Sequence, residues 1–139
     1  MVVCPLNPDS ASVDMRMPFS AASVSLVRHH LQSWLFRQGV SSSQIDDARL
    51  VVSELVGNSI RHAQPLPDGN ILVSCNADGA DLELSVTDGG STTSRPRALH
   101  PSSTASAGRG MAIVDDLTSS WWAERNGGAC TVHAVLSEP

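Results

Sequence analysis

Apolar and polar positions near the start of the chain follow first a period of two and then a helical period. Val13, Met15 and Met17 alternate with polar residues, which predicts a short strand. The next helix is expected to begin after an N-cap at Ser20 and to end at Gly39. Its apolar stripe consists of Val24, Val27, Leu31, Trp34 and Leu35.

A second helix is predicted from the capping-box pair Ser41 and Gln44 to about Ala63, before Pro65. Strands are expected next, at 71–75, around the alternating Leu82, Leu84 and Val86, and in a hairpin of 121–125 and 129–136. Between the middle strand and the hairpin lie a Ser/Thr/Pro/Arg-rich loop and a helix from Gly110 to about Ser119. Trp121 and Trp122 should point to opposite faces, one buried and one exposed on a possible partner surface.

These elements predict an α+β fold, a two-layer sandwich in which helices cover one face of a largely antiparallel mixed sheet. The length of 139 residues fits a single domain. Residues 1–11 hold Pro5 and Pro8 among small polar residues, so we expect a flexible N-terminal tail before a domain at 12–139.

Composition excludes several classes of function. All nine basic residues are arginine, so a P-loop, which requires lysine, is excluded, as are lysine-dependent kinases. The net charge of −5 and the lack of a basic run argue against direct binding to nucleic acid. No apolar run is long enough for a membrane span and no signal peptide is visible, so a cytoplasmic protein is expected.

Glu54, Asn58 and His62 are spaced by four residues and therefore share one stripe of the second helix. Carboxylate and amide oxygens one turn apart suit a hard divalent cation, and a carboxylate there can act as a base. A solvated polar stripe on a surface helix is the alternative.

Two glycine motifs follow. Asp88-Gly89-Gly90 ends a strand, where a carboxylate can accept a hydrogen bond from the adenine amine; an ordinary turn has the same composition. Gly108-Arg109-Gly110-Met111 is expected to open a helix, whose N-terminal amides bind anions; a glycine hinge without a ligand is the alternative.

The order of these motifs, over about 13–136, resembles the GHKL (Bergerat-fold) ATPases. The stretch 48–63 resembles the family's asparagine box, 88–90 and 108–111 its two glycine boxes, and 127–132 its closing segment. Within that group, E-L-V-x-N-x-x-x-H-A and G-R-G-x-x-I-V resemble the single-domain anti-sigma factor serine kinases of Gram-positive bacteria. Thr92 replaces a frequent glycine, and Gly57 precedes Asn58 where a bulkier residue is usual.

The resemblance implies an ATP site with Mg²⁺ held by Asn58 and a catalytic base at Glu54. Residues 91–107 would be the lid over ATP, and His62 either lines the site or caps the helix end. The remaining implied contacts are Asp88 and Thr131 to adenine, Gly90, Gly108 and Gly110 shaping the pocket, and Arg109 with the amides through Met111 facing phosphate.

The resemblance also implies a function: phosphorylation of a serine on an anti-sigma antagonist protein and sequestration of a sigma factor. An ATP-gated protein-binding module without phosphotransfer would use the same pocket and is the alternative. An isolated sensor-kinase domain is disfavoured because no helix with a phosphoacceptor histidine precedes the motifs. The family also implies a homodimer, for which an edge strand near the N-terminus is a plausible contact.

Overall fold

The computed structural model describes residues 2–7, 10–91 and 104–137 of the protein. The elements in these ranges are β1 (Val2–Asn7), β2 (Ser10–Pro18), α1 (Ala22–Arg37), α2 (Ser42–His62), β3 (Asn70–Asp78), β4 (Asp81–Asp88), α3 (Thr104–Leu117), β5 (Ser120–Asn126) and β6 (Ala129–Ser137). None of these helices is long and apolar enough to cross a membrane.

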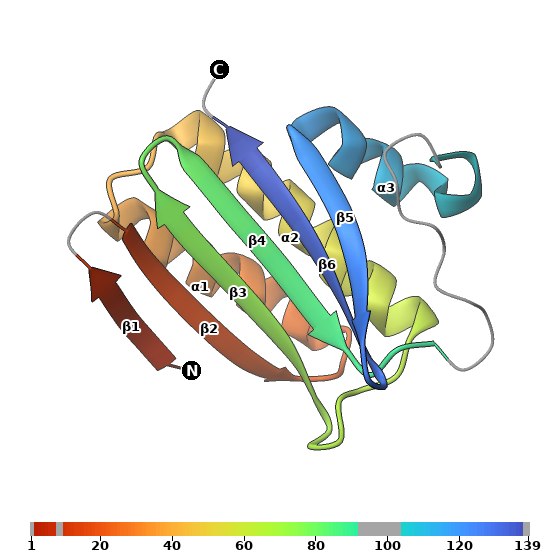
Figure 1. Ribbon diagram of the computed structural model, residues 1–139. Coiled ribbons are helices and arrows are strands. Elements are labelled where there is room, and N and C mark those ends of the chain that lie inside the picture. Colours follow the sequence, from red (N-terminus) through yellow and green to blue (C-terminus); the bar gives the residue numbers. More distant parts are fainter. Residues whose placement is uncertain (1, 8–9, 92–103, 138–139) are drawn as a thin grey trace.

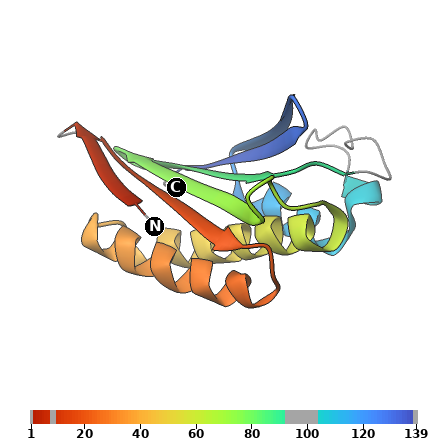
Figure 2. The ribbon, with the colours of Figure 1, turned by 90° about the horizontal axis from the view of Figure 1, so that it is seen from below.

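The strands form one sheet in the order β1-β2-β3-β4-β6-β5, and the helices cover a single face of it (Figures 1 and 2). This arrangement confirms the predicted two-layer α+β fold. Every pairing between the described strands is antiparallel, so the mixed character that we expected is not found. The reason is that β4 and β5 run in the same direction, but β6 inserts between them and pairs with both.

The hydrophobic core lies between the sheet and the helices. Alternate residues of each central strand point into it, including Val13 and Met15 of β2 and Leu84 of β4, none more than 2% exposed. The helical stripes predicted from the sequence supply the other layer, with Val27 and Leu31 fully buried. Each such side chain contributes about 1.5–3 kcal/mol when it leaves water, so this layer dominates stability.

Core burial predicts different costs for the same substitution on the two faces of α2. Leu55 is 2% exposed and Leu50 is 50% exposed. Leu55→Ala should lower the free energy of unfolding by about 2–5 kcal/mol, because it removes buried methyl groups and leaves a cavity. Leu50→Ala should change that free energy by less than about 0.5 kcal/mol. Urea unfolding followed by circular dichroism measures both, and equal losses would contradict the assignment of the buried face.

The start of α2 confirms half of the predicted capping box. The Ser41 side chain accepts a hydrogen bond from the Gln44 backbone N–H at 3.3 Å. The Gln44 side chain does not return to Ser41; its Nε2 donates to the carbonyl oxygens of Ala80 (2.9 Å) and Leu136 (3.2 Å). This buried amide therefore joins the start of the helix to the ends of two strands. In α1 the cap is Ala21 rather than Ser20, whose hydroxyl accepts from Ala22 N–H.

The structure replaces the predicted N-terminal tail by an edge strand. β1 pairs with β2, and the register is irregular between Cys4 and Asn7. Pro5 falls within this irregular stretch of an edge strand, where the missing N–H of a proline is tolerated. The proline content of 1–11 therefore did not exclude a strand.

α3 begins at Thr104, before the predicted start at Gly110. The stretch 104–107 contains two alanines, which favour helix and offset the cost of the glycines that follow, about 1 kcal/mol each. Residues 104–107, the last part of the predicted lid, are thus helical, and 92–103 lie outside the described residues.

Candidate functional site

The carboxylate of Asp88 is the central polar group of the candidate site. It lies at the end of β4, 6% exposed, on the face of the sheet that the helices cover. The Ser59 hydroxyl of α2 donates to Oδ2 at 2.5 Å, and the Gly90 N–H donates to Oδ1 at 2.8 Å. Burial raises the pKa of Asp88, and these two hydrogen bonds oppose the rise. The two donors fix the orientation of a buried hydrogen-bond acceptor.

Gly89 and Gly90 bring three backbone segments together beside this carboxylate. Gly89 N–H donates to Gln64 O at 2.7 Å and Gln64 N–H to Gly90 O at 3.0 Å. A Cβ at Gly89 would lie 2.1 Å from Pro65 O. Gly90 has φ +84°, and a Cβ there would lie 2.6 Å from Gly128 O. Close contacts within the protein therefore require glycine at both positions, independently of any ligand.

Helix α2 reaches the same region through Ser59. Asn58 precedes Ser59, and both Asn58 and Glu54 are partly exposed, next to the buried face of α2. His62 is exposed in the last turn, where the sequence allowed either a site role or a cap. The hydrogen bond from Ser59 therefore joins α2 to the Asp88 end of β4.

The side chains near Asp88 can be compared with the ligands that Mg²⁺ requires. The described residues contain no group of three or more His, Cys, Asp or Glu side chains suited to a metal ion. Mg²⁺ in nucleotide sites needs only one or two protein ligands, because substrate phosphates and water supply the others. Asn58 is partly exposed, and a side-chain amide oxygen is a ligand of the kind that such a site uses.

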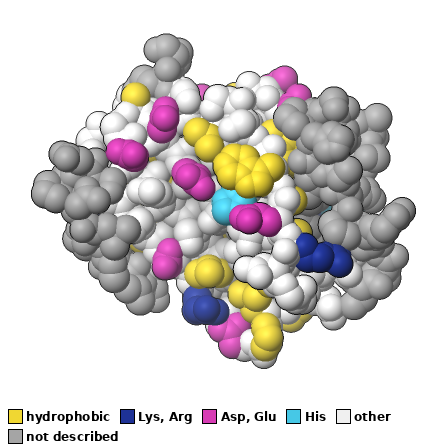
Figure 3. Space-filling model, in the orientation of Figure 1, with side chains coloured by type: hydrophobic (Ala, Val, Ile, Leu, Met, Phe, Trp, Pro, Cys, Tyr) yellow, Lys and Arg dark blue, Asp and Glu magenta, His cyan; other side chains and the backbone are white. Residues whose placement is uncertain are grey.

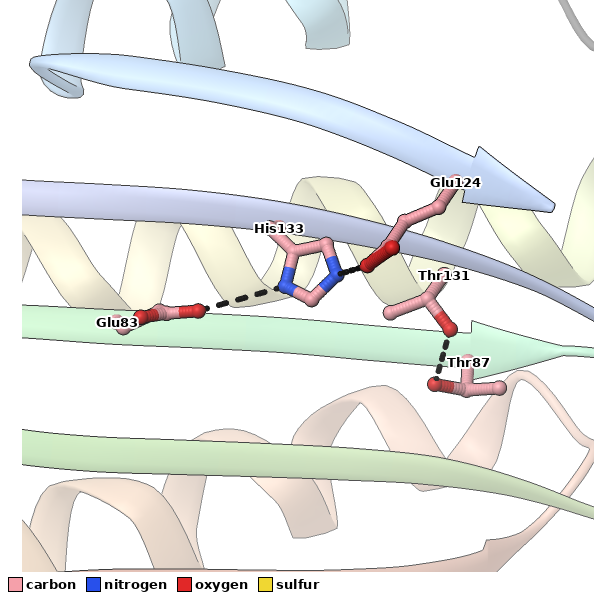
Figure 4. A network of polar contacts seen from close by, with 5 residues as sticks. All are labelled: Glu83, Thr87, Glu124, Thr131 and His133. Atoms are coloured by element: carbon pink, nitrogen blue, oxygen red, sulfur yellow. Dashed lines mark hydrogen bonds and ion pairs between the residues drawn. The ribbon is translucent and has the colours of Figure 1, made fainter. Parts of the chain in front are cut away.

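Thr131 does not lie beside Asp88, although the resemblance implied that both residues contact adenine. The hydroxyls of Thr131 and Thr87 are 2.8 Å apart on the face of the sheet away from the helices (Figure 4). Asp88 lies on the opposite face, and its register partner in β6 is Cys130. The pKa of the Cys130 thiol is raised first by burial and then by the charge of Asp88. The prediction was wrong by one residue, which in a strand reverses the face.

Ser59 and Cys130 are the residues that sequence reasoning missed. Ser59 stands four residues after Leu55, within the apolar stripe of α2. A polar side chain at a buried position needs a hydrogen-bond partner. The place of Ser59 in the apolar stripe therefore indicates, from the sequence alone, that its hydroxyl binds a buried polar group. Cys130 gave no comparable signal, because its position depends on the register between β4 and β6.

The second glycine motif lies inside α3 rather than at its start. Gly108 and Gly110 have helical neighbours on both sides, so the amides of 109–111 are not the free N-terminal amides of the helix. Met111 is 2% exposed and packs in the core. The side chain of Arg109 lies outside the described residues. The amides of 109–111 therefore do not form the helix N-terminus that the predicted anion site was expected to use.

A hollow on the described surface lies elsewhere, between the end of α1 and the start of α2. Its lining residues are Gln32, Ser33, Phe36, Arg37, Ser42, Ile45 and Asp46. Ser42 and Ser59 are separated by about 25 Å along the helix axis, at 1.5 Å per residue. This hollow is therefore distinct from the site at Asp88.

The curated proteins that are similar to this chain include serine-protein kinases. The serine-protein kinase RsbW of Staphylococcus epidermidis is 43% identical over 51 residues, which cover 37% of this chain and 32% of that protein. RsbW of Staphylococcus aureus strain JH9 gives the same values. The aligned stretch therefore spans about a third of these relatives.

Two solved structures share the fold. The RsbU and RsbW domains of a Mycobacterium tuberculosis protein superpose with a TM-score of 0.69 at 23% identity, covering 92% of this chain and 33% of that one. The SiaB–SiaC complex of Pseudomonas aeruginosa gives 0.66 at 14% identity, covering 89% and 88%. The model of the histidine kinase-like ATPase domain family matches residues 17–135. These residues include α2 and β4, the two elements that form the site at Asp88. The chain belongs to the histidine kinase-like ATPase domain family.

Proposed function

We propose that the protein binds ATP beside Asp88 and transfers its γ-phosphate to a serine of an anti-sigma antagonist protein, and that it also sequesters a sigma factor. The observation that carries the proposal is the buried Asp88 carboxylate, held by Ser59 and Gly90 at the end of β4. An acceptor fixed in this way suits the exocyclic amine of adenine. Membership of an ATPase domain family and the name of the RsbW relatives support the nucleotide and the serine acceptor.

The chain's own residues have separate tasks in this proposal. Asp88 orients the base, with Gly90 shaping the turn beside it. Asn58 offers the amide oxygen for Mg²⁺, which when bound neutralises charge on the phosphates. Glu54, one helical turn before Asn58, accepts the proton of the attacking serine hydroxyl while ADP leaves. Gly108 and Arg109 of α3 would contact the nucleotide only in a state in which the start of that helix is rearranged.

Magnesium dependence tests the site without requiring the protein substrate. Asn58→Ala should weaken ATP binding markedly in excess Mg²⁺, because the metal loses its protein ligand. The same variant should bind ATP like the wild type in EDTA, which makes metal-free binding the internal control. Isothermal calorimetry under both conditions gives the two affinities. If EDTA leaves the wild-type affinity unchanged, Mg²⁺ has no part in the site.

A further inference from the structure

The face of the sheet away from the helices, here called the open face, has an aromatic centre. Figure 2 shows the helices on the other side of the sheet only. The rings of Trp122 on β5 and His133 on β6 are stacked, with centroids 4.9 Å apart and planes 12° apart. Trp122 is 39% exposed, whereas its neighbour Trp121 points into the core and is 2% exposed. A large aromatic surface is therefore presented to solvent in the middle of a strand pair.

Two carboxylates hold the histidine of this centre in place. His133 Nε2–H donates to Glu124 Oε1 at 2.5 Å, and Nδ1 is 3.4 Å from Glu83 Oε2 (Figure 4). The second contact has the distance of an ion pair but not the geometry of a hydrogen bond, since Nδ1 has no hydrogen-bond partner. The side chains of Glu83 and Glu124 stay 46% and 59% exposed. Both carboxylates can therefore accept further hydrogen bonds from outside the protein.

The surroundings of the aromatic centre are acidic. Strand alternation and register place these carboxylates on the open face: Asp14, Asp78, Asp81, Glu83 and Glu124. Among the described strand residues of this face, Arg16 is the basic one, and its guanidinium already pairs with Asp68 at 2.6 Å. Figure 3 shows acidic side chains spread around a histidine and an adjoining hydrophobic side chain, with basic side chains toward the margins. The face thus carries a negative potential around an exposed indole.

We propose that the open face binds an arginine-bearing segment of a partner protein. A guanidinium can stack on the Trp122 ring and at the same time donate to the free oxygens of Glu83 or Glu124. Lysine fits less well, because its ammonium lacks the planar fork. A second copy of this chain is disfavoured as the occupant, because two acidic faces of a protein with net charge −5 repel each other.

The three tryptophans allow a direct test. A peptide with three arginines spaced by glycines is titrated into ¹⁵N-labelled protein at low salt, and the indole N–H signals are followed. The Trp122 signal should shift saturably, while those of the buried Trp34 and Trp121 stay in place. The same peptide with lysines should bind more weakly. Glu83→Gln combined with Glu124→Gln should weaken binding by about five- to tenfold, as expected for two exposed ion pairs.

The control removes two acidic groups from the helical side. Asp46→Asn combined with Asp116→Asn changes the net charge equally and should leave the affinity within about twofold. The proposal is overturned if the Trp122 signal does not move, or if both double variants weaken binding equally. It is also overturned if the wild type is a dimer that Trp122→Val separates, because a second copy would then cover the face. None of these outcomes depends on ATP binding, since Asp88 lies on the other face.

Discussion

Asp88→Asn is expected to reduce ATP affinity by about a hundredfold or more, below detection in a standard titration. Both carboxylate oxygens already accept a hydrogen bond from the protein, Oδ2 from Ser59 and Oδ1 from Gly90. The Gly90 N–H cannot turn, so the amide oxygen must face it, and the amide NH₂ takes the place of Oδ2. An N–H donor then faces the adenine amine, where the carboxylate offered an acceptor. The unpaired polar groups weaken ATP binding by about 1–3 kcal/mol, or more where a charged group is involved.

The same variant should remain folded. Burial raises the pKa of Asp88 above its ordinary value. An acid whose pKa is higher in the folded state stabilises the fold at low pH, and this contribution is lost as the pH rises through the folded pKa. Near neutral pH, burial of the ionised carboxylate no longer stabilises the fold. Replacing it with a neutral amide should therefore not lower the free energy of unfolding. Asp81→Asn, at the exposed start of the same strand, is the matched control and should bind ATP normally. Wild-type affinity in a folded Asp88→Asn protein would refute the site.

Glu54→Ala is expected to lower phosphotransfer by about a hundred- to ten-thousand-fold, the usual worth of a positioned general base. ATP affinity should change little, because Glu54 lies one turn from Asn58 and need not touch the metal. Transfer of labelled γ-phosphate to the antagonist measures the first quantity, and calorimetry measures the second. Low transfer together with lost ATP binding would show a damaged pocket and not a missing base.

Asp47→Ala is the control for this experiment. Asp47 is an acidic residue two turns before Glu54 on the same side of α2, and its removal should leave transfer unchanged. If Glu54→Ala retains full transfer, phosphotransfer by the protein stands but a different group acts as the base.

Residue periodicity predicted the fold well because most elements have one buried face. The alternation of Leu82, Leu84 and Val86 located β4, and the pair Trp121 and Trp122 split between core and surface as expected. Periodicity failed where no apolar pattern marks the structure. The Ala- and Ser-rich start of α3 has none, and β1 is an edge strand with an irregular register.

The site was harder to predict than the fold, because its contacts join residues far apart in the chain. Ser59 reaches Asp88 across 29 positions, and only the packing of α2 on β4 brings them together. The confusion of Thr131 with Cys130 shows that a motif locates a strand segment more securely than the face of each residue. The roles of Glu54 and Asn58 came from the resemblance, and they stay predictions.

Transfer of γ-phosphate by the wild-type protein is the most direct measure of the proposed function. Purified protein, Mg²⁺ and labelled ATP are incubated with each anti-sigma antagonist encoded by the native cell. Label is expected on a serine of one antagonist, with transfer lost in Asp88→Asn. ATP binding without transfer to any antagonist would contradict the kinase, and the protein would then be an ATP-gated binding module.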